Sequence, residues 1–531
     1  MSKKKRKIER LAKSFGLIKD DEYYFELIEK YFWNNDNTSS FQILSDRTCN
    51  DLDFEELFMF LDRTNSKVGQ QYLYNKLRNI PSDSRGFERR EEIIKKFTED
   101  FEFRIDIQRQ LDKLDKDDAY HITSLFQEEL KKPPKWFFVI QLLAFTSLVS
   151  VILLPFNPQM IFVLLGVFIV NLGIHYWNKR NLYEYVGSIP QLLRLNSLAS
   201  KLHKAPIFYE LNPNLGESIK IINQVRNRMS FFQLETKFKS NVEALFWLLM
   251  ELFKILFLLE PLFLFGVLKK LDTKREQIED VFCFVGEIDS LLSIASLRNG
   301  LDKFCLPTIR DTNISVSKIY HPLIHDCITN DIDVLDKSIL LTGSNMSGKT
   351  SFIRAIGINM ITGLTINTCF ADSITIPRYR IYSAIRISDD LMNDKSYYFE
   401  EVLTIKAMIE RSANGKHNLF LLDEIFKGTN TIERISAGKA VLSKLSRNNN
   451  MVLVSTHDIE LTEMLDKEYE LFHFSEIVKE KSVDFDYKLK RGKLKNRNAI
   501  RILKINDYPD DLINEAIEIS EKLDTFTVAN N

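Results

Sequence analysis

The sequence predicts an α/β P-loop ATPase domain with a mostly parallel sheet, joined to an all-α helical core or lever domain that carries a transmembrane helical hairpin. Three observations predict this fold class. A glycine-rich loop with Lys and Thr at its end follows a short apolar run at residues 338–341. From about residue 301, short apolar runs alternate with helix-like stretches, as in a sheet covered by helices. Two long, nearly uncharged runs follow each other between residues 136 and 177.

The chain divides into parts by composition and apolar spacing. Residues 1–40 are rich in charge and predict a helical N-terminal segment. The 3.6-residue spacing of apolar residues predicts helices on both sides of the hairpin. The predicted parts are the N-terminal segment (1–40), the first half of the helical core (41–135), the transmembrane hairpin (136–178), the second half of the core or lever with an apolar segment at 244–268 (179–300), and the P-loop ATPase domain (301–531).

The hairpin is predicted from runs 136–154 and 160–177, each roughly 18 to 19 residues, enough to cross a hydrocarbon layer of about 30 Å. A turn-forming link with two prolines separates them. Lysines at 131, 132 and 135 precede the pair, and Lys179 and Arg180 follow it. By the positive-inside bias, we expect a membrane protein with both termini and the ATPase domain in the cytoplasm. The alternative, a buried helical pair in a soluble core, is less favoured because neither run has a polar stripe.

A third apolar stretch, 244–268, is long enough to span a membrane but contains Glu251, Lys254 and Glu260. Charges at the centre of a bilayer cost about 3 kcal/mol each on insertion scales. Pro261 would also kink or end a helix. Two alternatives stay open: an interfacial or core helix packed beside the hairpin, or a further spanning segment.

The glycine-rich loop reads Gly343-Ser344-Asn345-Met346-Ser347-Gly348-Lys349-Thr350 and continues into a helix at Ser351. A loop of this kind between a strand and a helix aims several backbone N–H groups at one anion. Lys349 would reach the β- and γ-phosphates, and the Thr350 hydroxyl would ligate Mg²⁺. The loop therefore predicts a site for ATP or GTP.

Two later apolar runs end in polar residues, as buried parallel strands do when they deliver side chains to one edge of a sheet. Leu419 to Leu422 precede Asp423 and Glu424, and Met451 to Thr456 precede His457. Asp423 suits water-mediated binding of Mg²⁺, and Glu424 suits the general base that orients the attacking water. His457 could sense the γ-phosphate, although a single histidine after a strand is more often a surface or core residue. Together the three motifs predict nucleotide hydrolysis.

These motifs resemble those of the MutS family of DNA mismatch-repair ATPases. Residues 341–350 resemble its T-G-P-N-M-G-G-K-S/T loop, 423–431 its D-E-I-G-R-G-T-S-T segment, and 455–458 its A-T-H-Y switch. The stretch 388–401 is similar to the S/A-D-D-L and S-T-F-x-x-E segments between them. The resemblance implies ATP and Mg²⁺ as cofactors and a homodimer in which Ser396 enters the partner's nucleotide site. It also implies binding of mismatched DNA and a role in DNA mismatch repair.

The resemblance extends outside the ATPase domain and also has departures. Residues 57–69 are similar to the L-D-R-T-x-T-x-x-G segment that opens the family's helical core, and 287–295 to the helix that closes it. Further matches are His321-Pro322, Asn330-Asp331 and the Y-x-L-x-x-G stretch at 487–492. Departures are Ser344 for Pro, Ser347 for Gly and Phe426 for Gly. Because only some fifty residues precede the core-like segment, we expect neither the mismatch-reading domain nor the connector domain.

Composition limits the remaining hypotheses. The formal net charge of -1 over 531 residues gives no global attraction to nucleic acid. The basic run at 3–7 could bind anionic lipid or nucleic-acid phosphates, or be a solvated tail. Five scattered cysteines without C-x-x-C spacing predict neither zinc nor disulfides. Two functions follow: a membrane-anchored MutS-like ATPase that engages DNA as a dimer, or an ATPase that drives conformational change in a membrane protein assembly without DNA.

Overall fold

The structure is a computed structural model. It describes residues 3–83, 86–229, 232, 244–310, 313–335, 337–344, 346–386, 397–478, 483–494, 500, 503 and 508–529. The chain forms two compact units, each described by itself. The helical unit comprises residues 1–39, 59–78 and 84–301, and the sheet unit comprises residues 40–58, 79–83 and 302–531. Residues 40–58 and 79–83 pack with the sheets, whereas we expected residues 41–135 to form the first half of the helical core.

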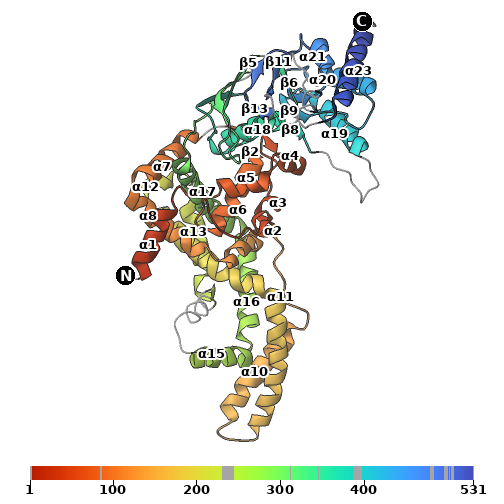
Figure 1. Ribbon diagram of the computed structural model, residues 1–531. Helices are drawn as coiled ribbons and strands as arrows, with labels where there is room; N and C mark the ends of the chain where they lie inside the picture. The colour runs from red at the N-terminus through yellow and green to blue at the C-terminus, as the bar shows by residue number, and fades with distance from the viewer. Residues whose placement is uncertain are drawn as a thin grey trace. The chain divides into compact units, whose positions relative to one another are not determined.

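Helix α17 is the central element of the helical unit, and nearly all its residues from Val281 to Arg298 are buried. It packs closely on α6, because Gly286 and Gly69 lack side chains at the crossing. A Cβ at Gly286 would lie 2.6 Å from the Cβ of Tyr72. The other helices surround this pair (Figure 1). They include α1 (Lys3–Ser14), α2 (Phe25–Ile28), α3 (Lys30–Trp33), α7 (Phe87–Glu99), α8 (Phe101–Leu111), α9 (Ser124–Gln127), α12 (Pro206–Tyr209) and α13 (Leu215–Asn223). The central pair is α6 (Lys67–Arg78) and α17 (Arg275–Gly300).

The two long apolar runs form a helical hairpin of α10 (Phe137–Leu153) and α11 (Met160–Leu202) that extends away from the rest of the helical unit (Figure 1). We expected separate helices before and after residue 178, but α11 runs on without a break and contains Pro190. By length and composition, α11 is the one helix in the described part of the chain that could cross a membrane, and α10 is shorter. Only 17% of the most apolar part of α11 is buried.

The third apolar stretch is two helices, α15 (Ala244–Phe257) and α16 (Leu259–Leu271). They are separated at Leu258, which has φ 48°, in the left-handed region. Figure 1 shows α15 lying across the direction of the hairpin, and α15 contacts both α10 and α11. Helix α16 is mostly buried. The stretch is therefore not one continuous spanning helix.

The sheet unit contains the predicted parallel sheet, in the strand order β14-β11-β6-β10-β9-β8. All neighbours are parallel except β14, which is antiparallel to β11. The strands are β6 (Ser338–Thr342), β8 (Arg380–Ala384), β9 (Asn418–Asp423), β10 (Met451–Thr456), β11 (Tyr469–His473) and β14 (Lys490–Arg491). Every residue of the central strands β6, β9 and β10 except Asp423 is buried, because both faces of the sheet are covered.

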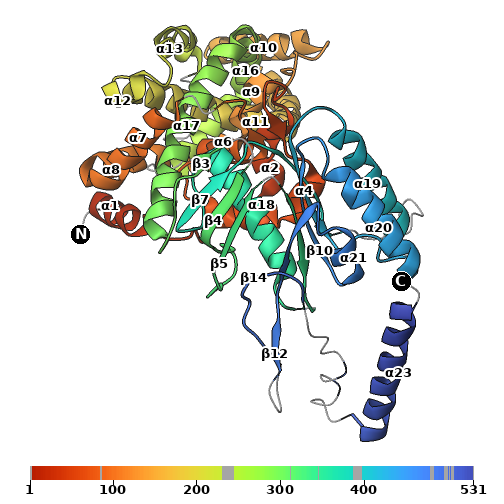
Figure 2. The same cartoon turned by 90° about the horizontal axis from the view of Figure 1, so that it is seen from above.

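Helices cover the two faces of this sheet, as Figure 2 shows for α18 on one side and α19 and α20 on the other. Successive side chains of a strand point to opposite faces. Leu421 meets α18 at Gly357, whereas Phe420 and Leu422 join a buried cluster with α19, α20 and α21. The helices are α18 (Lys349–Ile366), α19 (Tyr397–Ser412), α20 (Thr431–Leu445) and α21 (Glu460–Met464), and α23 (Asp510–Ala529) ends the described chain.

The early segment 40–58 belongs to the sheet unit because its acidic residues bind the edge of β8. Asp51 accepts hydrogen bonds from Ser383 Oγ and from the backbone N–H groups of Ile385 and Arg386. Asp53 pairs with Arg354 of α18 at 2.8 Å. The smaller elements are α4 (Asp46–Asp51), the pair β1 (Gln42–Ile43) and β2 (Asn79–Ile80), and the pair β12 (Glu476–Val478) and β13 (Val483–Phe485). A second sheet has the order β3-β7-β4-β5, with β3 (Thr308–Ile309), β4 (Asn313–Ile319), β5 (Asn330–Leu335) and β7 (Ser373–Ile376).

Candidate nucleotide site

Three strands of the main sheet end side by side and bring the predicted motifs together. Strand β10 lies between β6 and β9, with Thr456 opposite Thr342 and Ser455 opposite Asp423. The glycine-rich loop follows β6, the acid pair ends β9, and His457 follows β10. The carboxyl ends of parallel strands form one edge, so these side chains converge although they lie far apart in the sequence.

The loop 343–350 joins β6 to α18 with a backbone that requires glycine. Gly343 has φ 153°, and a Cβ there would lie 2.8 Å from Ser347 Oγ and 2.9 Å from the carbonyl oxygen of Phe474. Gly348 caps α18 with φ 104°. Ser344 and Ser347, which depart from the resembled motif, are accommodated because Ser347 Oγ donates to the Ser344 carbonyl at 2.8 Å. Asn345 lies outside the described residues.

Lys349 closes the loop. Its Nζ donates to the carbonyl oxygens of Gly343 and Ser344, each at 2.9 Å, and lies 3.4 Å from His457 Nε2. The side chain is buried, and burial lowers the pKa of the ammonium group. The positive charge therefore lies where the loop would hold phosphate oxygens.

Thr350 and Asp423 form a pair of oxygen ligands suited to Mg²⁺. Thr350 Oγ1 donates to Asp423 Oδ2 at 2.8 Å, and Ser455 Oγ donates to the other carboxylate oxygen. Among the described residues there is no group of three or more His, Cys, Asp or Glu side chains that could hold a metal alone. Mg²⁺ is usually held by one or two protein oxygens together with phosphates and waters, so this pair fits the ion.

Glu424 is the centre of a charged cluster. Its Oε1 lies 2.9 Å from His457 Nε2, and its Oε2 lies 3.0 Å from Lys427 Nζ. Burial alone would raise the pKa of this carboxyl, but hydrogen bonds from His457 and Lys427 outweigh burial and hold the pKa at about 2. Glu424 is therefore ionised at neutral pH. In the sequence, Lys427 is only a basic residue within a motif, and no role was predicted for it.

Phe426 stands where the resembled motif has glycine, and it keeps a glycine-like backbone with φ 61°. A left-handed backbone costs a bulky residue about 1 to 2 kcal/mol. Two contacts offset this cost: its N–H donates to Glu401 Oε1 at 2.5 Å, and its ring is buried near Tyr398. Burial raises the pKa of Glu401. The substitution is thus accommodated without moving Glu424 out of the site.

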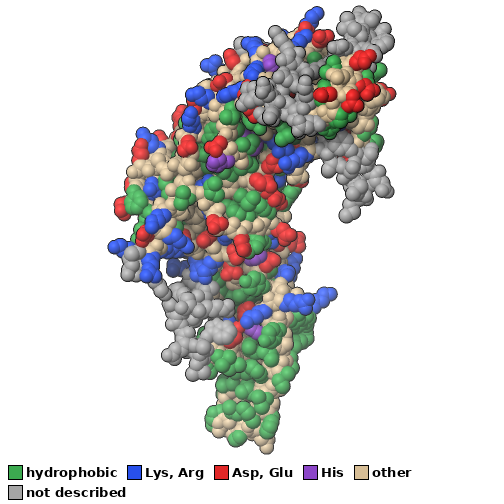
Figure 3. All heavy atoms as spheres, viewed as in Figure 1, with side chains coloured by type: hydrophobic (Ala, Val, Ile, Leu, Met, Phe, Trp, Pro, Cys, Tyr) green, Lys and Arg blue, Asp and Glu red, His purple; other side chains and the backbone are tan. Residues whose placement is uncertain are grey.

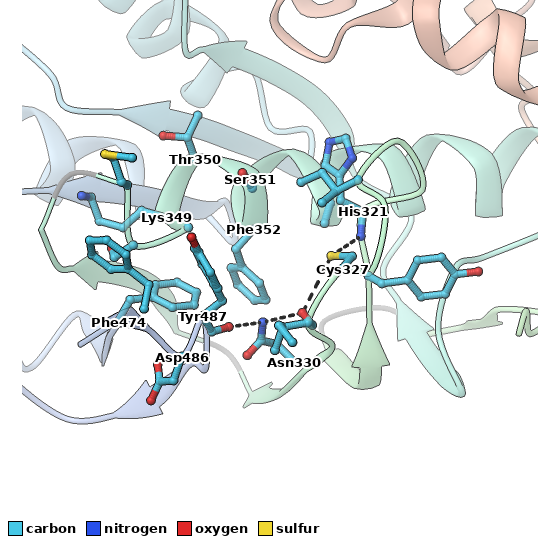
Figure 4. Close-up of a pocket in the computed structure, with 18 of the residues that line it drawn as sticks. His321, Cys327, Asn330, Lys349, Thr350, Ser351, Phe352, Phe474, Asp486 and Tyr487 are labelled. Atoms are coloured by element: carbon cyan, nitrogen blue, oxygen red, sulfur yellow. Dashed lines mark hydrogen bonds between the residues drawn. The ribbon is translucent and has the colours of Figure 1, made fainter. Parts of the chain in front are cut away.

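A cavity of about 860 Å³ opens beside the loop (Figure 4). Its walls include the loop, the segment 319–330 and the turn 485–487. Asn330 joins two of these walls, because its Nδ2 donates to the Tyr487 carbonyl at 3.0 Å and its Oδ1 accepts from the Leu489 N–H at 2.7 Å. Tyr487 lies against Gly348, where a Cβ would be 3.3 Å from its ring. The cavity is large enough for a nucleoside beside the phosphate loop.

His321 lines this cavity on the side opposite Lys349 (Figure 4). Burial, joined by the charge of Arg354, lowers the pKa of His321 to about 4, so the imidazole is neutral. His321 Nδ1 accepts from the Leu323 N–H at 3.3 Å. In the sequence, His321-Pro322, Asn330-Asp331 and the Y-x-L-x-x-G stretch were similar to segments of the MutS family, but no role was predicted for them.

The remaining predicted site residues divide into two groups. Ser351 and Met346 line the cavity with the loop. Ser396 and the stretch 388–391 lie outside the described residues, and the predicted role of Ser396 stays a prediction.

Comparison with known proteins agrees with this arrangement. Residues 339–524 match the family model MutS domain V. Several relatives carry the name DNA mismatch repair protein MutS. The protein of Oceanobacillus iheyensis is 29% identical over 262 residues, which cover 46% of this chain and 30% of the relative. The protein of Thermotoga maritima is 27% identical over 332 residues, which cover 61% of this chain and 40% of the relative. The protein of Listeria monocytogenes serotype 4a is 30% identical over 266 residues, which cover 47% of this chain and 30% of the relative. The matched region thus spans well under half the length of these relatives.

Proposed function

Because this chain is a MutS-family protein, with residues 339–524 matching MutS domain V, we propose that it is an ATPase held to a lipid bilayer by its helical hairpin. ATP would bind on the loop 343–350 with Mg²⁺, and hydrolysis would use Glu424 and His457. The proposal of ATP hydrolysis rests on one observation: Lys349, the Thr350–Asp423 pair and Glu424 converge at one edge of the sheet.

The loop and its neighbours would bind and orient the triphosphate. Backbone N–H groups at the start of α18 point toward an anion in the loop, and Lys349 adds a full positive charge. Mg²⁺ bound at Thr350 and Asp423 would neutralise charge on the phosphate oxygens. Cavity residues such as Tyr487 and Asn330 would surround the nucleoside, which fixes the position of the reacting phosphate.

Glu424 would act as the base that orients and deprotonates the attacking water. With a pKa of about 2, it is ionised at neutral pH, but both its oxygens are engaged by His457 and Lys427. A phosphate group next to Lys349 would attract the same two hydrogen-bond donors. We therefore infer that substrate binding draws His457 or Lys427 toward the phosphate and frees a Glu424 oxygen for water.

Membrane attachment is supported by the inverted arrangement of side chains in the hairpin. Large apolar residues point outward: Phe162 is 73% and Ile169 71% exposed. Polar residues point inward: Asn171 is fully buried and donates to the Leu256 carbonyl at 2.7 Å, and Asn178 is buried and donates to Glu260 at 3.1 Å. Figure 3 shows the hydrophobic side chains gathered over this part of the helical unit. In water this arrangement is unfavourable, and in hydrocarbon it is the expected one.

Helix α15 has the same inverted arrangement. Leu249 and Phe253 are exposed, whereas Lys254 is buried and lies 2.5 Å from Glu251. Glu251 also lies 2.7 Å from Lys179 of α11. Because α15 lies across the hairpin, we propose that it rests in the membrane interface with its apolar face in the lipid. The bilayer would then end near Lys179 and Arg180, with the ATPase on the cytoplasmic side.

Two variants test the catalytic proposal in detergent-solubilised full-length protein. Glu424→Gln should lower ATP turnover on the order of 10²- to 10⁴-fold and leave ATP binding intact, because only the base is lost. Lys349→Ala should instead weaken ATP binding itself. Turnover that persists in Glu424→Gln would reject the role of Glu424 as the base.

The same assay separates the two functional classes. The family resemblance supports a homodimer that engages DNA, with Ser396 completing the partner's site. Turnover would then change when duplex, mismatched or branched DNA is added. Turnover that responds to lipid and not to any of these DNAs would favour an ATPase that acts on a membrane protein assembly.

A further inference from the structure

The helical unit carries a groove of about 360 Å³ that is lined by four cations. Lys113 comes from the short helix η1 (Asp112–Leu114), Arg194 and Lys201 come from the second half of α11, and Arg226 follows α13. The described lining residues include neither a carboxylate nor an aromatic ring. Three segments far apart in the sequence thus bring positive charge to one concave surface.

Little of this charge is neutralised by neighbours. Lys201 Nζ lies 3.2 Å from Asp106, and Arg194 donates to the neutral Gln191 at 3.2 Å. Within the described part of the chain, Lys113 and Arg226 form no ion pair. Holding like charges together is unfavourable unless an anion binds between them.

Positive charge continues from the groove onto α1. Lys7 and Arg10 both pair with Asp112, the residue next to Lys113 in the sequence, so one carboxylate serves two cations. In Figure 3 Lys and Arg side chains gather over α1, α8 and α13. The groove is therefore the concave part of a wider basic surface.

The groove also holds a buried amide with unused hydrogen-bonding capacity. Asn196 is only 3% exposed, and its Nδ2 donates to Asn223 Oδ1 at 3.1 Å. Among the residues that the structure describes, none donates a hydrogen bond to its Oδ1. A buried acceptor without a partner costs about 1 to 3 kcal/mol, and a bound water can donate to it, whereas the oxygens of an ionised phosphate cannot.

We propose that this groove binds a ligand that carries at least two phosphate groups. Lys and Arg with amide and hydroxyl groups are the donors that recognise phosphate. The absence of an aromatic ring among the described lining residues argues against base stacking, so recognition is by charge and spacing. Such phosphates occur in a nucleic-acid backbone and in soluble polyphosphorylated molecules.

Lipid headgroups are a poor source of these phosphates. Arg194 follows Lys179 by fifteen residues on the same continuous helix, which corresponds to about 22 Å at 1.5 Å per residue. The headgroup region beyond the hydrocarbon is only roughly 5 to 8 Å thick on each side. This step alone rests on the proposed membrane hairpin, and the groove itself does not depend on ATP hydrolysis.

Binding to the full-length protein in detergent tests the proposal. All proteins carry Lys349→Ala, so that the probes do not bind at the nucleotide loop. The probes are tripolyphosphate, a fluorescent 20-base-pair duplex and vesicles with anionic phospholipid. We expect Lys113→Glu and Arg226→Glu each to weaken binding of tripolyphosphate or duplex roughly tenfold, with a steep salt dependence for the duplex. Lys220→Glu, an exposed cation on α13 outside the groove, is the matched control and should change binding less than threefold.

The outcomes separate the possibilities. Binding of tripolyphosphate alone identifies a soluble ligand, and binding of the duplex identifies a nucleic-acid backbone. Equal losses in Lys220→Glu and Lys113→Glu would mean diffuse attraction to a basic surface, and no binding of either phosphate probe would mean no site; both overturn the proposal. These binding measurements do not depend on ATP hydrolysis, so they would be unchanged if the protein did not hydrolyse ATP.

Discussion

The nucleotide site and the hairpin use similar apolar residues in opposite ways. In the sheet unit, strands β6, β9 and β10 are apolar because they are sealed between two helical layers, and Leu421 has no exposed surface. In the hairpin, residues such as Phe145 and Phe162 face outward. The polar residues are reversed as well: Glu424 and His457 lie at an open edge, whereas Asn171 and His175 lie inside. The direction of the side chains, more than composition, indicates the medium that each region faces.

Charge on the outward apolar face of the hairpin should prevent membrane attachment. Phe145→Arg combined with Ile169→Arg should cost about 3 kcal/mol per arginine at the membrane centre, together enough to prevent insertion. Flotation of the protein with lipid vesicles measures the effect. Ile432→Arg, at a similarly exposed apolar residue of α20, is the control and should leave flotation unchanged.

If both variants float alike, the outward apolar face is not a lipid contact. If neither the double variant nor the wild type floats, the hairpin does not anchor the chain.

Removal of a buried charge beside the hairpin should destabilise the folded protein. Glu251 holds Lys254 and Lys179, so Glu251→Ala leaves a buried lysine without this partner. Loss of one member of a buried ion pair costs about 3 kcal/mol or more. We expect a large drop in the thermal unfolding temperature in detergent, and a smaller drop for Glu251→Gln, which keeps hydrogen bonds. The exposed pair Lys95–Glu99 is the control, and Glu99→Ala should cost less than about 0.5 kcal/mol.

Local patterns in the sequence predicted which polar residues follow the central strands. The loop 343–350 and the pair Asp423 and Glu424 each follow an apolar run in the sequence, and the structure brings them to one edge of the sheet. Contacts between distant segments were not predictable in this way. Asp51 joins the edge of β8 by hydrogen bonds to residues more than three hundred positions away. No glycine marks the break between α15 and α16 at Leu258. The ion pair between Lys427 and Glu424 was likewise not predicted from the sequence.

Protonation of His321, at the wall of the nucleotide cavity, should lower the free energy of unfolding at acidic pH. The pKa of His321 is lowered to about 4 in the folded protein, against 6.5 in an unfolded chain. A base with a depressed pKa favours the folded state above pH 6.5, and this contribution is lost as the pH falls from 6.5 toward 4. Between pH 7 and pH 5, the loss should be about 2 kcal/mol.

His321→Gln should remove this part of the pH dependence, because glutamine does not titrate. Thermal unfolding of the wild type and the variant at pH 7 and pH 5 measures it. The destabilisation of the wild type on acidification should exceed that of His321→Gln by about 2 kcal/mol, whereas His325→Gln, at a fully exposed histidine nearby, should behave like the wild type. Equal acid sensitivity in all three proteins would show that His321 titrates normally and that the wall of the cavity is open to water, like the edge that carries Glu424.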